Sequence, residues 1–480
     1  MKELTDQKIT VYGQIKNYNQ NSNQKTIGFN FQTLENVKSD IKIANINANG
    51  EFEIETTIAW PQDFFFEYGD ERFYFICEPN DSFRIEIDNG IWNENEDDKI
   101  KCVSVIGGSA VANNKFVNAF ISRVDNSLKH CISYENVKNL EANEYKNFVL
   151  SQKKEADKTL HMLLDTLNTT PLFEKWARNY INHYVWSSLL RYHIWHTAYN
   201  NIDRFEFEIP VNYYSFLDDF DMYYNEVIST HQEGFYHEYS IYLDELLPLD
   251  SLEKQWELFD TDVISYFSSS IEQRAKFSSG FTSDIIIYEI YSRMLDWSFI
   301  AEWETIYQPK IFNYQYFAKK IEAKYTQIKE HIENPIFTEN LNFIFNNNQI
   351  LESLLDTIHL KYQDKVIYIN FWSPSCGPCL QEIPSSIDLQ MEYQDENVIF
   401  LNLASGCKEE AWKAKISEKQ LSGEHLLLNN DQFRNLQAKF EITGTPHYVL
   451  IDKKQNVILK NAPRPSNKEI RKEINNLLID

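Results

Sequence analysis

The feature that most constrains this chain is the stretch from Val366 to Pro384, which reads VIYINFWSPSCGPCLQEIP. An apolar, β-branched run of strand length at 366–371 is followed by a short turn of serine and proline. Cys376 and Cys379 come next, and one turn of helix brings residues at this spacing to the same side. The stretch therefore predicts a strand, a turn and a helix, with Cys376 at the helix N-terminus.

This placement predicts different roles for the two cysteines. The first turn of a helix has unpaired N–H groups and the positive end of the helix dipole, which stabilise the thiolate of Cys376 and lower its pKa. Cys379 lies one turn deeper, and we expect it to attack a mixed disulfide formed by Cys376 and to release the partner. Pro378 suits the first turn because it needs no N–H there, and Gly377 leaves room for a partner chain.

A C-x-x-C pair is also found as half of a zinc site. Zinc normally takes four ligands, and the sequence has no second C-x-x-C pair and no matching histidine pair nearby. His193 and His196 are spaced for one helix face, but no third ligand is in register with them. We therefore predict a redox pair with no metal and no cofactor, and a metal site or an inert pair remains the alternative.

A second motif follows at 442–452, where the sequence is ITGTPHYVLID. A proline that leads directly into an apolar strand indicates a cis bond between Thr445 and Pro446. Such a bond turns the backbone of Thr445 toward the thiols, where it can pair with a substrate strand. An ordinary trans proline at the start of a strand is the alternative.

Together the two motifs resemble the exported thioredoxin-like thiol-disulfide oxidoreductases of the TlpA/ResA type. The resemblance covers residues 340–480 and is greatest to multidomain members from Bacteroidetes, in which a β-rich segment and a helical segment come first. It implies a disulfide-containing protein substrate, an upstream thiol electron donor, and substrate contacts at Trp372, Gly377, Pro378, Thr445 and Pro446.

Glu382 is the third predicted catalytic residue. Thioredoxin has a buried aspartate two residues before the tryptophan of its F-W pair, whereas this chain has Asn370 there. Members of the TlpA/ResA group carry a C-x-x-E-x-P arrangement, which Cys379, Glu382 and Pro384 match. A partly desolvated carboxylate at this position could exchange a proton with Cys379. The alternative is an acid on the solvated face of the helix.

The charge of the chain excludes some partners. With 46 Lys and Arg against 71 Asp and Glu, the net charge is −25. Such a surface repels the phosphates of nucleic acids and anionic lipid head groups. No apolar run is long enough to span a bilayer, and the N-terminus lacks the apolar core of a signal peptide. The resemblance nevertheless predicts a periplasmic protein, anchored as a lipoprotein before processing, and a cytoplasmic protein is the alternative.

A chain of 480 residues predicts about three domains. Alternating strands predict an antiparallel β-sandwich at 1–108, where Asn49 and Gly50 indicate a hairpin turn before the strand at 51–55. Cys77 and Cys102 lie on candidate strands and form either a disulfide or two buried thiols. The tract at 92–99 is predicted to be an acidic loop.

The residues at 109–335 have the period of helices, as in Phe116, Phe120, Val124 and Leu128. We predict an all-α domain whose aromatic residues form its core, with a partner groove or a homo-oligomer interface as alternatives.

Residues 336–480 are predicted to be an α/β thioredoxin-like domain. The parallel strands 366–371 and 398–403 place the thiols and Cys407 at one edge of the sheet. Cys407 is then either a third redox thiol or a loop cysteine. The remaining predicted elements are strands 447–452 and 456–460 and helices 351–358, 377–393, 408–420, 431–439 and 467–478.

The sequence thus predicts a thiol-disulfide oxidoreductase that reduces disulfides in protein or peptide substrates. The Gly-Pro pair between the cysteines resembles that of reducing thioredoxins, and this resemblance implies the reducing direction. The alternative is a redox-sensing binding protein, in which the cysteine pair gates partner binding without turnover.

Overall fold

The computed structural model forms two compact units, residues 1–290 with 306–320 and residues 291–305 with 321–480. The structure describes residues 3–20, 24–32, 34, 40–68, 71–90, 99–203, 206–210, 212–219, 229–230, 235–245, 261–278, 280–296, 299–344, 358 and 360–479. The three predicted domains therefore remain a prediction, and each compact unit is described by itself.

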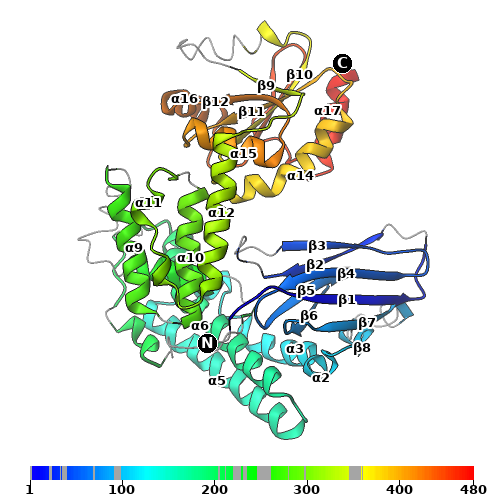
Figure 1. Cartoon of the computed structure of the whole chain (residues 1–480), viewed down its shortest axis with the longest axis vertical. Coiled ribbons are helices and arrows are strands. Elements are labelled where there is room, and N and C mark those ends of the chain that lie inside the picture. Colours follow the sequence, from blue (N-terminus) through cyan, green and yellow to red (C-terminus); the bar gives the residue numbers. More distant parts are fainter. Residues whose placement is uncertain are drawn as a thin grey trace. The chain divides into compact units, whose positions relative to one another are not determined.

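The first unit begins with two four-stranded sheets, in the orders β4-β1-β7-β8 and β3-β2-β5-β6 (Figure 1). Neighbouring strands are antiparallel, except that β1 and β7 are parallel. Apolar side chains of both sheets share one buried core, which confirms the β-sandwich. The strands are β1 (Gln7–Lys16), β2 (Thr26–Phe31), β3 (Asp40–Asn45), β4 (Glu51–Ile58), β5 (Gln62–Tyr68), β6 (Glu71–Cys77), β7 (Ser82–Asp88) and β8 (Val103–Gly107).

The predicted hairpin at Asn49 and Gly50 is wrong. A tight turn does form there, because the N–H of Gly50 donates to Asn47 O and Gly50 has a φ of +78°. However, β3 pairs with β2 and β4 pairs with β1, so the turn carries the chain from one sheet to the other. The prediction of a tight turn at these residues is therefore correct, but a tight turn does not determine which strands pair.

Helices cover the edge of the second sheet. Asn114 accepts from the N–H of Ile76 at 2.7 Å and donates to its carbonyl at 2.8 Å. Asn118 does the same for Tyr74, at 2.8 and 3.0 Å. The two amides thus take the place of a further strand along β6, whose backbone would otherwise be open to pairing with another chain. Cys77 and Cys102 are both buried, and they form no disulfide.

The helical region begins after the sandwich and confirms the predicted period. Phe120, Val124 and Leu128 are fully buried on one face of α3, and Thr170 caps α6 ahead of Pro171. None of the described helices is both long and apolar enough to cross a membrane. The helices are α2 (Val111–Asn114), α3 (Val117–Leu128), α4 (Tyr134–Asn139), α5 (Ala142–Thr166), α6 (Pro171–Asn200), α7 (Phe235–Glu245), α9 (Val263–Phe277), α10 (Gly280–Asp296), α11 (Trp303–Ile306) and α12 (Gln315–Glu333), with 3-10 turns η1 (Lys99–Cys102), η2 (Tyr213–Asp219) and η3 (Pro309–Ile311).

The second unit contains a six-stranded mixed sheet in the order β14-β13-β10-β11-β12-β9 (Figure 1). Strands β10, β11, β12 and β9 are parallel, while β13 and β14 are antiparallel to their neighbours. The elements are β9 (Leu341–Phe343), β10 (Val366–Trp372), β11 (Val398–Ala404), β12 (Gly423–Leu427), β13 (His447–Ile451), β14 (Val457–Leu459), α14 (Gly377–Glu392), α15 (Glu409–Lys419), α16 (Asn430–Phe440) and α17 (Glu469–Ile479).

Helices cover both faces of this sheet, as βαβ connections require. Side chains of α14 and α17 pack on one face and those of α16 on the other. The predicted strands and helices from residue 366 onward are confirmed, but β9 and β12 were missed. The predicted helix at 351–358 and the acidic loop at 92–99 lie almost entirely outside the described residues.

Candidate active site

The two cysteines lie where β10 gives way to α14. Cys376 is the N-cap of α14, and its sulfur accepts the N–H of Cys379 at 3.2 Å. Pro378 lies in the first turn, where its missing N–H leaves no helical hydrogen bond unmade. The two sulfurs form a disulfide, with Cα atoms 5.2 Å apart. The pair is therefore already joined at the positive end of a helix, where a thiolate is stabilised.

The two sulfurs differ in accessibility. Cys376 is partly exposed, whereas Cys379 is only 5% exposed. Cys379 belongs to a buried group that we call the thiol cluster: Trp372, Cys379, Ala404, Trp412 and Ile416. A partner can therefore reach the outer sulfur, while the inner one is shielded.

Glu382 is buried one turn beyond Cys379, with 8% of its surface exposed. Its carboxylate accepts from the N–H of Ser466 at 3.0 Å and from the Ser466 hydroxyl at 2.9 Å. Arg464 Nη1 is 3.9 Å away. The alternative of a solvated surface acid is therefore wrong. Its hydrogen bonds in the described part of the chain go to Ser466 and not to Cys379, so a role toward that thiol remains a prediction.

Thr445 and Pro446 are joined by a cis peptide bond. They precede β13, in which His447 is the register partner of Phe371 on β10. This antiparallel pairing brings Pro446 to the C-terminal end of β10, where the turn that leads to Cys376 begins. Both residues are partly exposed there, as are Gly377 and Pro378 beside Cys376.

Trp372 occupies a different position from the other predicted substrate contacts. It is 2% exposed and packs in the thiol cluster, and its Nε1 has no hydrogen-bond partner among the described residues. In this oxidised state the indole packs in the same cluster as Cys379. Its contact with a substrate remains a prediction.

Comparison with known proteins agrees with this geometry. Residues 364–457 match the family model described as thioredoxin-like. The chain belongs to the thioredoxin-like oxidoreductases. A search of the curated proteins found no match.

Solved structures similar to the thioredoxin-like domain come from several bacteria. A candidate thiol-disulfide oxidoreductase from Bacteroides vulgatus is 30% identical, over 25% of this chain and 82% of that one, with a TM-score of 0.22. The thioredoxin domain of another thiol-disulfide oxidoreductase from Bacteroides vulgatus is 20% identical, over 25% and 83%, with a TM-score of 0.23. A thiol:disulfide interchange protein from Chlorobium tepidum is 19% identical, over 25% and 84%, with a TM-score of 0.23.

Cys407 lies on the loop after β11 and packs against the thiol cluster, as Cys376 does. Burial raises the pKa of its thiol to about 12. A thiol that is scarcely ionised near neutral pH is a poor nucleophile. This favours a loop cysteine over a third redox thiol in the thioredoxin-like domain.

Sequence reasoning noted Asn370 but missed the row of polar side chains to which it belongs, in which Asn370 is partly exposed and Asn402 and His425 are buried. Asn370 of β10 donates to Asn402 of β11 at 3.1 Å, and Asn402 lies 3.3 Å from His425 Nε2 on β12. Two residues after each of these three positions come Trp372, Ala404 and Leu427. The first two belong to the thiol cluster, and Leu427 packs against it. Since every second residue of a strand points to the same side, the polar row lies on the sheet face that carries the thiol cluster. Polar residues inside a strand pattern are the signal that could have indicated the row.

The described residues contain no group of three or more potential metal-ligating side chains. His196 Nδ1 instead contacts Val137 O at 2.8 Å, and the ring of His193 stacks on Phe207. Both histidines therefore serve the packing of the helical region.

Proposed function

We propose that this protein reduces disulfide bonds in protein or peptide substrates by thiol-disulfide exchange. One observation carries the proposal: Cys376 and Cys379 are joined at the N-terminus of α14, with the outer sulfur partly exposed and the inner one buried. This is the asymmetry that separates an attacking sulfur from a resolving one.

In the proposed cycle, the thiolate of Cys376 attacks one sulfur of the substrate disulfide, and the other substrate sulfur leaves as a thiolate. Cys379 then loses its proton and attacks the sulfur of Cys376, which releases the second substrate thiolate. The substrate gains two electrons and takes up two protons, while the enzyme is left with its own disulfide. An upstream dithiol returns the two electrons and restores both enzyme thiols.

Three further groups have proposed roles in this cycle. Glu382 exchanges a proton with Cys379 during resolution, which its burial one turn beyond that sulfur supports. Thr445 and Pro446 dock the substrate chain, since they flank the thiols at the same end of β10. Trp372, Gly377 and Pro378 are the further proposed substrate contacts, and Gly377 leaves room for a partner chain beside Cys376.

We also propose the reducing direction and export to the periplasm as a lipoprotein, which follow from the resemblance. Self-association through the helical region is a further proposal, which rests on the alternative use of that region as a homo-oligomer interface. The second candidate function is a redox sensor that changes partner binding without turnover. The same disulfide would serve it, so catalytic turnover is the property that separates the two.

The test uses three serine variants of the full chain and the reduction of insulin with dithiothreitol as electron donor. We expect Cys376→Ser to lower insulin reduction to the rate of dithiothreitol alone, and pre-reduced Cys379→Ser to accumulate a mixed disulfide with insulin once dithiothreitol has been removed. Cys131→Ser, at a cysteine of the first compact unit that is not disulfide-bonded, is the control and should retain the wild-type rate. Wild-type-like turnover by Cys376→Ser would refute the assignment of the nucleophile. A wild-type protein that binds insulin but does not reduce it would favour the sensor.

A further inference from the structure

The loop after β11 forms one side of the thiol site. The N–H of Ser405 donates to Trp372 O at 3.2 Å, so the loop starts directly beside the strand that carries the cysteines. Cys407 packs against the thiol cluster, and Lys408 is the N-cap of α15. Helix α15 adds Trp412 and Ile416 to the same cluster. Any shift of α15 therefore moves side chains that pack in the same cluster as Cys379.

A segment from outside the thioredoxin-like match holds the N-terminus of α15. Lys408 Nζ lies 3.4 Å from Glu302 Oε1 and 5.5 Å from the centre of the Phe299 ring. The side chain of Glu302 is 19% exposed, and its Oε2 is buried without a hydrogen-bond partner among the described residues. A mostly buried carboxylate is costly unless a cation compensates it. Lys408 is the cation placed to do so.

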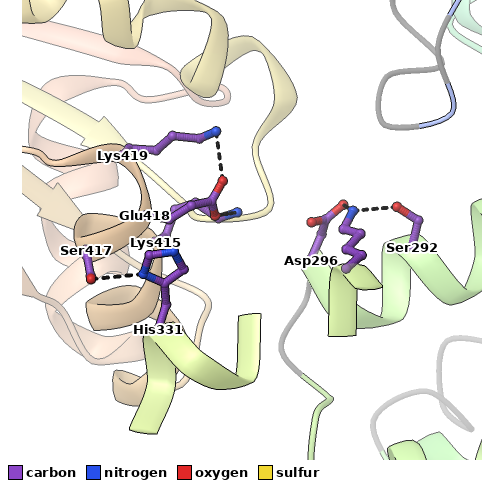
Figure 2. Close-up of polar contacts among 8 residues, drawn as sticks. Ser292, Asp296, His331, Lys415, Ser417, Glu418 and Lys419 are labelled. Carbon is purple, nitrogen blue, oxygen red and sulfur yellow. Dashed lines mark hydrogen bonds and ion pairs between the residues drawn. The ribbon is translucent and has the colours of Figure 1, made fainter. Parts of the chain in front are cut away.

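This segment is itself fixed to the helix α12, which follows it in the chain. Trp303 is 4% exposed and stacks on Tyr325 of α12, with ring centres 4.7 Å apart and planes 8° apart. Lys324 of α12 bonds Asp296 at the end of α10 at 2.8 Å (Figure 2). Glu302 therefore meets Lys408 from a fixed position rather than from a free loop.

The C-terminal end of α15 contacts α12 and the residues that follow α12. Ser417 is fully buried, and its hydroxyl oxygen accepts the N–H of Ile336 at 2.8 Å. His331, in the last turn of α12, places Nδ1 3.1 Å from the same oxygen (Figure 2). Gln420 donates to Ile336 O at 3.0 Å. Helix α15 is thus held at its N-cap, Lys408, and in its last turn, at Ser417.

We propose that Glu302 and Ser417, with the residues they contact, form a clamp on α15 that determines how polypeptide substrates dock beside the disulfide. The inference rests on the proposed function and adds the docking surface, loop 405–408, to it. None of the clamp contacts described here involves Cys376 or Cys379. A small disulfide needs only to reach Cys376, whereas a polypeptide must also fit against the loop. Glu302 is therefore a positioning residue whose loss affects large substrates selectively.

The kinetic test compares insulin with hydroxyethyl disulfide, a small uncharged substrate. We expect Glu302→Gln to raise KM for insulin about threefold or more and to leave kcat/KM for the small disulfide unchanged. Lys408→Met should have the same effect, and the double variant should add little to either single one. Glu304→Gln, at an exposed position of α11, is the matched control and should behave as wild type.

A second readout does not depend on activity. In the oxidised protein Cys77, Cys102 and Cys131 are buried and Cys376 and Cys379 are joined, which leaves Cys407 as the partly exposed free thiol. We expect maleimide labelling of Cys407 to become several-fold faster in Glu302→Gln and Ser417→Ala, but not in Glu304→Gln.

The two readouts separate the possible failures. An unchanged KM for insulin, or an equal loss on both substrates, would overturn the docking role of the clamp. Unchanged labelling would show that Glu302 does not hold the loop, and would overturn the clamp itself. A wild-type protein that reduces neither disulfide would refute the proposed function, and the labelling would still decide whether the clamp exists.

Discussion

Glu382 combines a buried position with an ionisable side chain in the helix that carries both thiols. Ser466 supplies two hydrogen bonds to its carboxylate, which fixes the side chain between α14 and the segment before α17. A carboxylate held in this way can take a proton from a nearby thiol and return it in the next half-reaction. We predict that Glu382→Gln slows the release of substrate from the mixed disulfide by about tenfold or more.

Stopped-flow measurement of that release step between pH 6 and pH 9 tests the role of Glu382. A carboxylate that exchanges the proton should change the shape of the pH profile and not only its height. Glu392→Gln is the control, because Glu392 lies in the last turn of the same helix and pairs with Arg471 at 2.7 Å. The prediction fails if Glu382→Gln leaves both the release rate and the titration of Cys379 unchanged.

At the scale of single residues, the relative positions of the predicted residues could be foreseen where a local motif encodes them, while their roles stay predictions. Cys376, Cys379 and Pro446 meet at one end of β10, because strand direction and helix spacing determine their positions. Ser466 and Glu302 were missed. They reach the site across long stretches of sequence, and nothing in the residues around them distinguishes them from ordinary polar positions.

The polar row of Asn370, Asn402 and His425 extends across three strands and belongs to the scale of elements. His425 is fully buried on β12, with Nε2 3.0 Å from Ser422 O and Nδ1 without a partner among the described residues. Burial lowers the pKa of His425 to about 4, and the Ser422 carbonyl and the charge of Glu424 oppose this shift only in part. The imidazole is therefore neutral in the folded protein at neutral pH.

This pKa makes the stability of the protein depend on pH. In the unfolded chain a histidine takes up a proton near pH 6.5, whereas the folded protein resists protonation until about pH 4. We predict that the free energy of unfolding falls between pH 6.5 and pH 4 by on the order of 2–3 kcal/mol through His425 alone. The stability contributed by the neutral ring is fully present above pH 6.5 and is lost as the pH falls.

Urea unfolding of wild type and His425→Gln at pH 7, 5.5 and 4 measures this effect. The variant should be less stable at pH 7 but should lose less stability on acidification. His130→Gln is the control, because His130 is exposed on the helical region and should leave the pH dependence as in wild type. Parallel pH dependence of His425→Gln and wild type would contradict the assignment.

Secondary structure was predictable where the pattern was long. The strand at 366–371 and the helix at 377–393 were recovered, since an apolar run and a 3.6-residue period mark them. Strand β9 was missed because it has only three residues, and β12 because the five residues Gly423–Leu427 contain two polar side chains. Their pairing with the sheet, rather than their local sequence, makes them strands.

The grouping of elements into compact units could not be read from sequence. Residues 291–305 have the helical period of the region before them, yet they cluster with the thioredoxin-like domain. The stacking of Trp303 on Tyr325 and the pairing of Glu302 with Lys408 account for this grouping. Both are contacts between side chains far apart in sequence, for which periodicity gives no signal.

The net charge of −25 is a property of the whole molecule and should select among substrates. Raising the ionic strength from about 0.01 M to about 1 M shortens the Debye length from about 30 Å to about 3 Å, which removes long-range steering. We predict that kcat/KM for a disulfide-linked basic peptide falls by about tenfold or more over this range. For an acidic peptide of the same length it should rise, because the screened charges then repel it less.

Hydroxyethyl disulfide serves as the uncharged reference in this comparison. The salt dependence of its reduction rate reports any effect of salt on the exchange chemistry itself. Dividing kcat/KM of each peptide by that of hydroxyethyl disulfide at the same ionic strength therefore isolates the effect of salt on the encounter of peptide and protein. Equal salt dependence for the basic and the acidic peptide would mean that the acidic side chains lie too far from the disulfide to act on an approaching substrate. Opposite slopes would show that the excess of carboxylates across the molecule favours basic polypeptides before any contact with the thiol site is made.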